Sequence, residues 1–310
     1  MIPPKLNRGD EIRIIAPSSS LARMRADVFD KAVAFLEESG FNVTFSKHCR
    51  EMDQFSSSSV QSRIEDLHDA FADQNVKAVM ACIGGFNANQ ILPFIDYGLI
   101  SENPKILCGY SDITALLCAV YARTGLVTYH APHLAALGFL QEREYTYQYL
   151  AACVMSEEPV SVRPSEAAGN YTVIQEGSCE SVIAGGNLCT LNLLQGTPYM
   201  PDLTDKVLFI EDDNIVGDFF PYEFDRNLQS LLQVSGGDTI RGIVFGRFEE
   251  NCGMSAEMIQ AIIRGKIPAD LPVVFGVDFG HVFPMISFPV GGRVQLSAHT
   301  DKVRIQIMEH

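Results

Sequence analysis

The sequence predicts an α/β protein in two parts: a parallel α/β sheet first, and a smaller, β-rich and barrel-like part after it. In the first half, short apolar runs alternate with helical patterns, which is typical of parallel strands joined by helices. The second half has many short apolar runs, and the stretch between the halves is polar and irregular. We therefore expect an N-terminal domain at residues 1–150, a linker at 151–180 and a C-terminal domain at 181–310.

Each element of the first part has its own signal. The strands are expected at apolar runs bounded by turn residues, namely Ile12–Ala16, Asn42–Phe45, Lys77–Ile83, Lys105–Cys108 and Val127–His130. Apolar residues at helical spacing predict helices over 25–39, 60–71 and 112–124. Ser58 with Gln61 predicts a capping box before the second helix.

The second part is predicted to consist of strands of mixed direction. Its apolar runs are Val182–Ala184, Val207–Ile210, Gly242–Phe245, Pro272–Phe275, Arg293–Ser297 and Val303–Ile307. One helix is expected at about Phe224–Gln233. This pattern indicates a compact α+β or barrel-like domain.

The charge of the chain restricts its partners. The 310 residues include 23 Lys and Arg against 38 Asp and Glu, a formal net charge of −15. Such a chain repels phosphate backbones, so we expect no nucleic-acid partner, and a small anionic substrate would need a local cation. The first ten residues lack the apolar segment of a secretory signal, and the longest strongly apolar run, Ile113–Ala122, is too short to cross a bilayer. We expect a cytoplasmic protein with no membrane partner.

Metal and cofactor motifs are not recognised in the sequence. The eight cysteines form no Cys-x-x-Cys pair and lack the spacing of a zinc site. The glycine pair Gly84-Gly85 lacks the spacing of a dinucleotide fingerprint. We expect neither a metal nor a cofactor.

The sharpest local feature is Gly109-Tyr110-Ser111-Asp112-Ile113, between a predicted buried strand and a predicted helix. A serine at such a junction exposes its hydroxyl on a sharp turn, and the N–H of Asp112 points from the helix start toward the same place. This predicts a nucleophile with an oxyanion donor. The alternative is that Ser111 only caps the helix, since Ile113 stands where the usual esterase turn has glycine.

A second loop, Ile83-Gly84-Gly85-Phe86-Asn87, also follows a predicted buried strand. Two glycines let the backbone approach a ligand closely, and the N–H of Gly85 is a candidate second oxyanion donor. The alternative is an ordinary tight turn.

A serine nucleophile needs a base, and the base needs an acceptor that orients it. His281 follows a strand and a glycine between apolar flanks, while His130 and His133 lie around another strand end as competitors. Glu211 ends a buried strand, is followed by Asp212, and is the candidate acceptor. The alternative for Glu211 is a solvated loop carboxylate.

Four segments together resemble the LD-carboxypeptidase family of serine peptidases, which includes the microcin C self-immunity peptidases. The segments are Gly109–Leu116, Gly185–Leu188, Phe209–Asp212 and Asp278–His281. The match runs in family order from Ala16 to Pro289, so it covers nearly the whole chain.

The resemblance implies a catalytic triad of Ser111, Glu211 and His281. It places the serine on an N-terminal α/β domain and the other two residues on a swivelling C-terminal β-domain, with the catalytic site between them. It also implies a homodimer that needs no metal.

The first glycine loop distinguishes two branches of the family. LD-carboxypeptidases proper tend to have Arg-Gly-Gly-Tyr-Gly there, whereas Ile83, Asn87 and Asn89 resemble the microcin-immunity branch, which makes Asn87 a candidate for substrate binding. That branch stacks a linker tryptophan on the adenine of an aminoacyl-nucleotide. This chain has no Trp, and its linker offers only Tyr171.

Arg247 and Glu249 align with a family segment near the substrate. A cation and an anion two residues apart at a strand end would meet the carboxylate and the amino group of a small peptide. The alternative is a salt-bridged surface loop.

These inferences predict a serine peptidase that hydrolyses an amide bond near the C-terminus of a small peptide-like substrate. The bond is either an L–D bond of a muropeptide or the amide of a microcin C-like aminoacyl-nucleotide. The alternative from another class is a non-catalytic two-domain protein that binds a small ligand.

Overall fold

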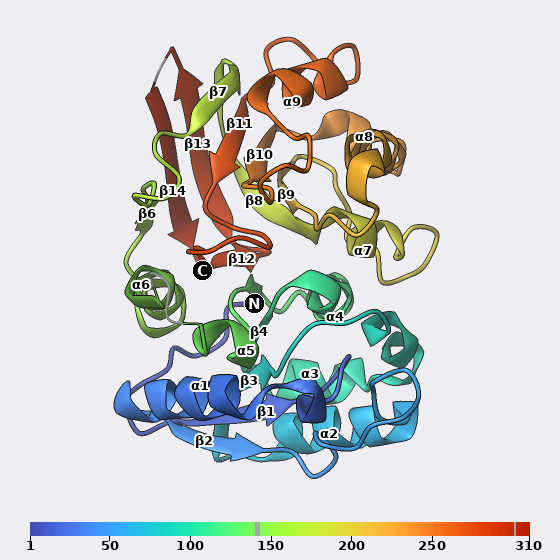
Figure 1. The fold of residues 1–310 in the computed structure, drawn as a ribbon, viewed down its shortest axis with the longest axis vertical. Helices are drawn as coiled ribbons and strands as arrows, with labels where there is room; N and C mark the ends of the chain where they lie inside the picture. Colours follow the sequence, from blue (N-terminus) through green and yellow to red (C-terminus); the bar gives the residue numbers. More distant parts are fainter. Residues whose placement is uncertain (140–142, 301) are drawn as a thin grey trace.

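The computed structural model describes residues 1–139, 143–300 and 302–310. They form two β-sheets with helices around them, and Figure 1 shows the N-terminal half below the C-terminal half. The predicted class, a parallel α/β sheet followed by a β-rich part, is confirmed. One continuous apolar core includes residues of both halves. Within these residues no helix has the length and apolarity of a membrane span.

The first sheet has six strands, of which the five N-terminal ones run parallel. Their order across the sheet is β12 (Phe288–Val290), β5 (Thr128–His130), β4 (Ile106–Gly109), β3 (Val76–Ala81), β1 (Glu11–Ile15) and β2 (Asn42–Phe45). The helices of this half are α1 (Ala26–Glu38), α2 (Val60–Ala72), α3 (Tyr97–Glu102), α4 (Thr114–Thr124), α5 (Leu134–Leu137) and α6 (Arg143–Met155), with 3-10 helices η1 (Leu21–Arg23), η2 (Ala88–Phe94) and η3 (Ser111–Ile113). Because parallel strands end at one edge, the residues after β1, β3 and β4 meet there.

Helix α2 begins at Val60, as predicted, but its capping residue is one position later than predicted. The hydroxyl of Ser59 accepts a hydrogen bond from the N–H of Ser62 at 3.0 Å, so Ser59 is the N-cap. The predicted capping box of Ser58 with Gln61 is therefore wrong. Ser59 has the extended backbone that lets a cap hydroxyl reach the first turn of a helix, whereas Ser58 is buried one residue earlier.

The second sheet has eight strands of mixed direction. Their order is β6 (Val160–Val162), β14 (Lys302–Glu309), β13 (Arg293–His299), β8 (Gly177–Asn187), β9 (Lys206–Glu211), β10 (Gly242–Gly246), β11 (Val273–Val277) and β7 (Thr172–Gln175). The run from β8 to β11 is parallel, and the other pairings are antiparallel. The helices of this half are α7 (Leu188–Asn192), α8 (Phe220–Leu231) and α9 (Ala256–Ile263), with 3-10 helices η4 (Gly217–Phe219) and η5 (Gly237–Thr239).

Short elements without a sequence signal join the two halves. The edge strands β6 and β7 lie in the stretch 151–180, where the sequence predicted a linker. Strand β12 comes from the C-terminal half but pairs antiparallel with β5 in the first sheet. Helix α9 was also not expected. Each of these strands has three or four residues, too few for a period-2 pattern to stand out.

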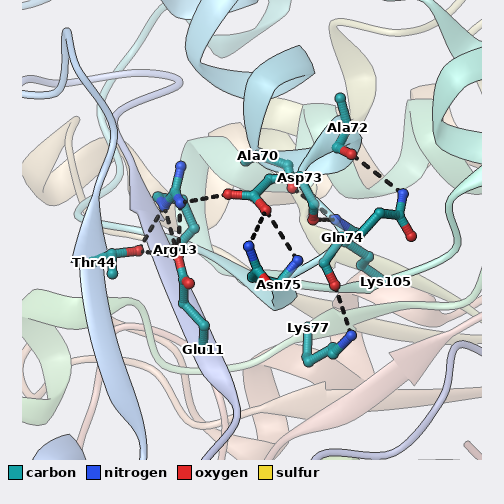
Figure 2. A network of polar contacts seen from close by, with 10 residues as sticks. All are labelled: Glu11, Arg13, Thr44, Ala70, Ala72, Asp73, Gln74, Asn75, Lys77 and Lys105. Carbon is teal, nitrogen blue, oxygen red and sulfur yellow. Dashed lines mark hydrogen bonds and ion pairs between the residues drawn. The ribbon is translucent and has the colours of Figure 1, made fainter.

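A polar network fixes α2 at the edge where the parallel strands begin (Figure 2). The guanidinium of Arg13 on β1 pairs with Glu11 at 2.7 Å and with Asp73, after α2, at 3.1 Å. The ammonium of Lys105, just before β4, donates to the carbonyls of Ala70 and Asp73. The network therefore anchors the end of α2 at the sheet edge opposite the one that follows β1, β3 and β4.

Candidate active site

Ser111 stands on a strained turn between β4 and α4. Its φ is +63°, a left-handed value that is uncommon for a residue with a side chain. A Cβ on Gly84 would lie 3.0 Å from Ser111 Cβ and 3.1 Å from its Oγ, so a larger residue at 84 would crowd the hydroxyl. The predicted strand–turn–helix junction is therefore present, and its neighbouring glycine leaves space for the serine.

Three elements bring Ser111, His281 and Glu211 into one line. His281 follows β11, and its Nε2 lies 3.0 Å from Ser111 Oγ. Its other ring nitrogen, Nδ1, lies 2.8 Å from Oε2 of Glu211, the last residue of β9. The Glu211 side chain is fully buried and that of His281 is largely buried. The serine comes from the first sheet and its two partners from segments of the second.

Glycines in the recognised motifs make this approach possible. A Cβ on Gly280, whose φ is +113°, would lie 3.0 Å from Glu211 Cβ and 3.1 Å from Oε2. A Cβ on Gly186 would lie 2.6 Å from Oγ1 of Thr114, the first residue of α4. The N–H of Asn187 donates to that same hydroxyl at 3.0 Å. Small residues at 186 and 280 therefore let the serine-bearing helix and the glutamate reach the interface between the sheets.

The electrostatics of the site favour an imidazolium beside a carboxylate. Burial alone would raise the pKa of Glu211, but the adjacent imidazoles of His281 and His130 outweigh it and hold that pKa well below its usual range. Burial alone would lower the pKa of His281, but the charge and hydrogen bond of Glu211, with Asp213 and Asp212, raise it above its ordinary value. Glu211 is thus built to stabilise positive charge on His281.

The competing residues make other contacts. Nδ1 of His133 accepts a hydrogen bond from the N–H of Ala136 at 3.1 Å and caps α5, and burial lowers the pKa of His133. His130 Nε2 faces Glu211 at 3.7 Å. The carboxylate of Asp212 accepts from Asn187 Nδ2 at 3.1 Å and from a backbone N–H, and burial raises its pKa. The geometry therefore singles out His281 next to Ser111 and Glu211 next to His281.

The two predicted oxyanion donors lie on connected loops. Among the described residues, neither the N–H of Gly85 nor that of Asp112 donates a hydrogen bond to a loop or turn carbonyl. The Asp112 carboxylate accepts from Ser18 Oγ at 2.5 Å and from the N–H of Ala88 at 2.8 Å. Asp112 therefore ties the loop after β1 and the glycine loop to the serine turn, and both backbone donors stay available.

Asn87, which the sequence predicted to bind substrate, accepts hydrogen bonds from a buried arginine that the sequence did not indicate. Arg63 of α2 donates from Nη1 to the Asn87 carbonyl at 2.9 Å and to Asn87 Oδ1 at 3.3 Å. It also reaches the Pro17 carbonyl at 3.2 Å and Gln90 Oε1 at 2.7 Å. Its guanidinium is buried among loops, which no local sequence pattern reveals. Arg63 therefore links the loop after β1 to the glycine loop and η2, which surround Ser111.

Arg247 and Glu249 do not share a strand face, contrary to the prediction. Strand β10 ends at Gly246, before either charged residue, and the ring of Phe248 packs against Phe220 and Phe224. Glu249 is exposed, and it has no polar partner within the described part of the chain. Arg247 is largely buried, and its guanidinium contacts its own chain: Nε lies 2.9 Å from Asp278 Oδ1, and Nη2 donates to the Phe283 carbonyl at 3.0 Å.

Asp278 is a second residue that the sequence analysis missed as a site element. Its buried carboxylate accepts from Ser165 Oγ at 2.8 Å and from the hydroxyls of Tyr145 and Tyr171, each at 3.1 Å, besides Arg247. Tyr171 is therefore buried, with its hydroxyl on Asp278. A carboxylate directly after an apolar strand was the available signal. Asp278 connects the segment 163–171 to the loop that carries His281.

No group of three or more His, Cys, Asp or Glu side chains in residues 1–139, 143–300 and 302–310 is arranged to hold a metal ion. A serine on a strained turn, in line with a histidine and a buried glutamate, is the arrangement found in serine hydrolases.

Comparisons with known proteins identify the family. The profile of the LD-carboxypeptidase N-terminal domain matches residues 12–131, and that of the C-terminal domain matches residues 180–296. The Bacillus subtilis protein named putative carboxypeptidase YocD is 40% identical over 328 residues, which cover 100% of both chains. The crystal structure of an MccF-like protein from Bacillus anthracis has a TM-score of 0.97 at 44% identity and covers 100% of both chains. The microcin C7 self-immunity protein MccF of Escherichia coli is 30% identical over 332 residues, covering 97% of this chain and 94% of its own.

The chain belongs to the LD-carboxypeptidase family of serine peptidases. The resemblance read from the four sequence segments is thereby confirmed. Both family domains are matched, and together the matches include Ser111, Glu211 and His281.

Proposed function

We propose that Ser111 is the nucleophile, His281 the general base and Glu211 the residue that orients His281. The observation that carries this is the line of contacts from Ser111 Oγ to His281 Nε2 at 3.0 Å and from His281 Nδ1 to Glu211 Oε2 at 2.8 Å. Ser111 Oγ attacks the substrate carbonyl while His281 takes its proton. The free N–H groups of Gly85 and Asp112 stabilise the oxyanion.

The reaction then ends by hydrolysis. His281 gives the proton to the leaving nitrogen as the carbon–nitrogen bond breaks, and an acyl group remains on Ser111. A water molecule, deprotonated by the same histidine, attacks the acyl group, and His281 returns that proton to Ser111 Oγ as the ester bond breaks. A non-catalytic ligand-binding protein would have no use for this line of contacts or for a strained serine.

We propose a small peptide-like substrate cleaved near its C-terminus. A relative from Pseudomonas aeruginosa is named murein tetrapeptide carboxypeptidase, and this name supports an L–D bond of a muropeptide. A second candidate is the amide of an aminoacyl-nucleotide, because a solved MccF structure holds aspartyl sulfamoyl adenosine. Tyr171 is buried and the chain has no Trp, so neither supplies adenine stacking of the kind that the resemblance implies.

The two substrates can be separated directly. We would incubate the purified chain, and its Ser111→Ala variant as control, with a muropeptide tetrapeptide and with aspartyl sulfamoyl adenosine, and follow the products by mass spectrometry. Loss of the terminal D-residue with the wild type alone supports the muropeptide. Release of aspartate with the wild type alone supports the nucleotide. Cleavage of neither, or equal cleavage by Ser111→Ala, contradicts the proposal.

The pH profile of the reaction follows from the environment of His281. Only neutral imidazole accepts the serine proton, and Glu211 raises the pKa of His281. As the pH falls through this raised pKa, the base becomes protonated and kcat/KM falls. We expect a single acid limb whose midpoint lies above the reference histidine pKa of about 6.5. A profile that is flat from about pH 5 to 8 would rule out His281 as the base.

Arg247 is proposed to attract the substrate carboxylate in addition to its contacts with Asp278 and Phe283. We expect Arg247→Ala to lower kcat/KM for a substrate with a free C-terminal carboxylate about 10- to 150-fold more than for its carboxamide analogue. The comparison cancels any damage to the fold, which affects both substrates equally. Equal losses on the two substrates would show that Arg247 stabilises the fold and does not bind the substrate carboxylate. Glu249→Gln is the matched test of binding to the substrate amino group.

We further propose that the enzyme is a cytoplasmic homodimer. The resemblance to the family supports the dimer, and the eight free cysteines are those of a chain kept under reducing conditions. Sedimentation of the purified chain and fractionation of cells that express it test the two statements.

A further inference from the structure

Glu211 lies between two imidazole rings that come from different sheets. Its Oε2 faces His281 Nδ1 at 2.8 Å, and its Oε1 faces His130 Nε2 at 3.7 Å. The side chains of Glu211 and His130 are both fully buried. Among the described residues, Glu211 Oε1 and both ring nitrogens of His130 have no hydrogen-bond partner. Buried polar atoms without hydrogen-bond partners cost free energy. A hydrogen bond between His130 Nε2 and Glu211 Oε1 would remove part of this cost.

Packing against two phenylalanine rings holds the His130 ring with its Nε2 toward Glu211. His130 ends β5, where it lies opposite Phe288 of β12. Its ring stacks on Phe288 with centroids 4.5 Å apart and planes 9° apart, and meets Phe279 edge-on. These two contacts restrain the ring, and from the present 3.7 Å a movement of roughly 1 Å between the sheets would bring Nε2 within hydrogen-bonding distance of Glu211.

We propose that His130 is a positioning residue of this peptidase: as a neutral ring protonated on Nε2, it donates a hydrogen bond to Glu211 Oε1. This rests on the proposed triad and adds a fourth member to it. The second donor satisfies the buried carboxylate and draws part of its charge away from His281. His281 then passes the serine proton on to the leaving nitrogen more readily than it would beside an unshared carboxylate.

The carboxylates around His281 raise its pKa, and a second donor to Glu211 opposes this rise. The titratable groups that face it or its partner come from several elements: Glu211, Asp212 and Asp213 at the end of β9, His130 on β5, His133 at the start of α5, and Tyr110 beside Ser111. The carboxylates all raise the pKa of His281, and too strong a rise would keep the base protonated at neutral pH. A donor on the far side of Glu211 opposes that effect.

The kinetic experiment compares two substitutions at the same position. His130→Phe keeps the stacking ring but removes the donor. We expect it to lower kcat/KM about 10- to 100-fold with little change in KM, and to move the acid limb of the profile to higher pH. His130→Gln keeps a donor and should restore most of the rate and the wild-type midpoint. His133→Asn, which retains an acceptor for the cap of α5, is the control and should leave the midpoint in place.

A second measurement needs neither turnover nor a variant at 130. In Ser111→Ala labelled with ¹⁵N-histidine, NMR reports which ring nitrogen of His130 carries the proton. We expect Nε2 to be protonated and Nδ1 unprotonated across the titration of His281. A proton on Nδ1, or an acid limb of His130→Phe that stays in place or moves to lower pH, overturns the proposal. Activity that survives in Ser111→Ala would instead overturn the triad, so the two failures are distinguishable.

Discussion

Replacing Ser111, His281 or Glu211 by alanine is expected to lower kcat/KM by about three decades or more in each case. The three side chains act as one unit, because the proton leaves Ser111 only if His281 is neutral and oriented by Glu211. For the same reason, Ser111→Ala combined with His281→Ala should be hardly slower than Ser111→Ala alone. Steady-state rates on the cleaved substrate, with thermal unfolding to verify the fold, provide the measurement.

Asp212 supplies the matched control for the glutamate. It neighbours Glu211 and is also buried, but its carboxylate contacts Asn187 and a backbone N–H instead of His281. Asp212→Asn should therefore cost far less activity than Glu211→Ala. Near-normal turnover of Glu211→Ala together with an inactive Asp212→Asn would transfer the orienting role to Asp212.

The sequence was sufficient to predict the parts of the site that lie at strand ends. Ser111 follows an apolar run and Glu211 ends one, so each lies at the carboxyl end of a parallel strand in its own sheet, where functional residues of such sheets gather. The choice among His281, His130 and His133 was not fixed by local pattern. It depends on which loop the second sheet presents to the first, and that is a property of the assembled fold.

The remaining parts are determined by contacts between distant segments. Arg63 and Asp278 are buried charges whose partners lie many residues away, and no spacing rule connects them. The strand-face argument for Arg247 and Glu249 failed because β10 ends at Gly246, before either residue. Likewise β12 pairs with β5 across the two halves, so its three residues gain their structure from a partner far along the chain.

Asp278→Asn is expected to be the most destabilising of the conservative changes near the site. The carboxylate is fully buried and pairs with Arg247 at 2.9 Å, whose own side chain is largely buried. Removing one partner leaves the other charge uncompensated, which costs about 3 kcal/mol in the free energy of unfolding when the survivor is partly solvated. Asp278 lies three residues before His281 in the chain and also holds Ser165 and Tyr171, so its loss should lower kcat about tenfold as well.

A double-mutant cycle distinguishes the ion pair from a general weakening of the fold. If the loss comes from the unpaired guanidinium, then Arg247→Met combined with Asp278→Asn should unfold at higher urea concentration than the sum of the single changes predicts. The exposed Asp270, near the start of β11, gives the control: Asp270→Asn should change the unfolding free energy by less than about 0.5 kcal/mol. Additive losses would mean that Asp278 acts only as the acceptor of hydrogen bonds from nearby hydroxyls and a backbone N–H. The segment 163–171, rather than Arg247, would then hold the loop of His281 in place.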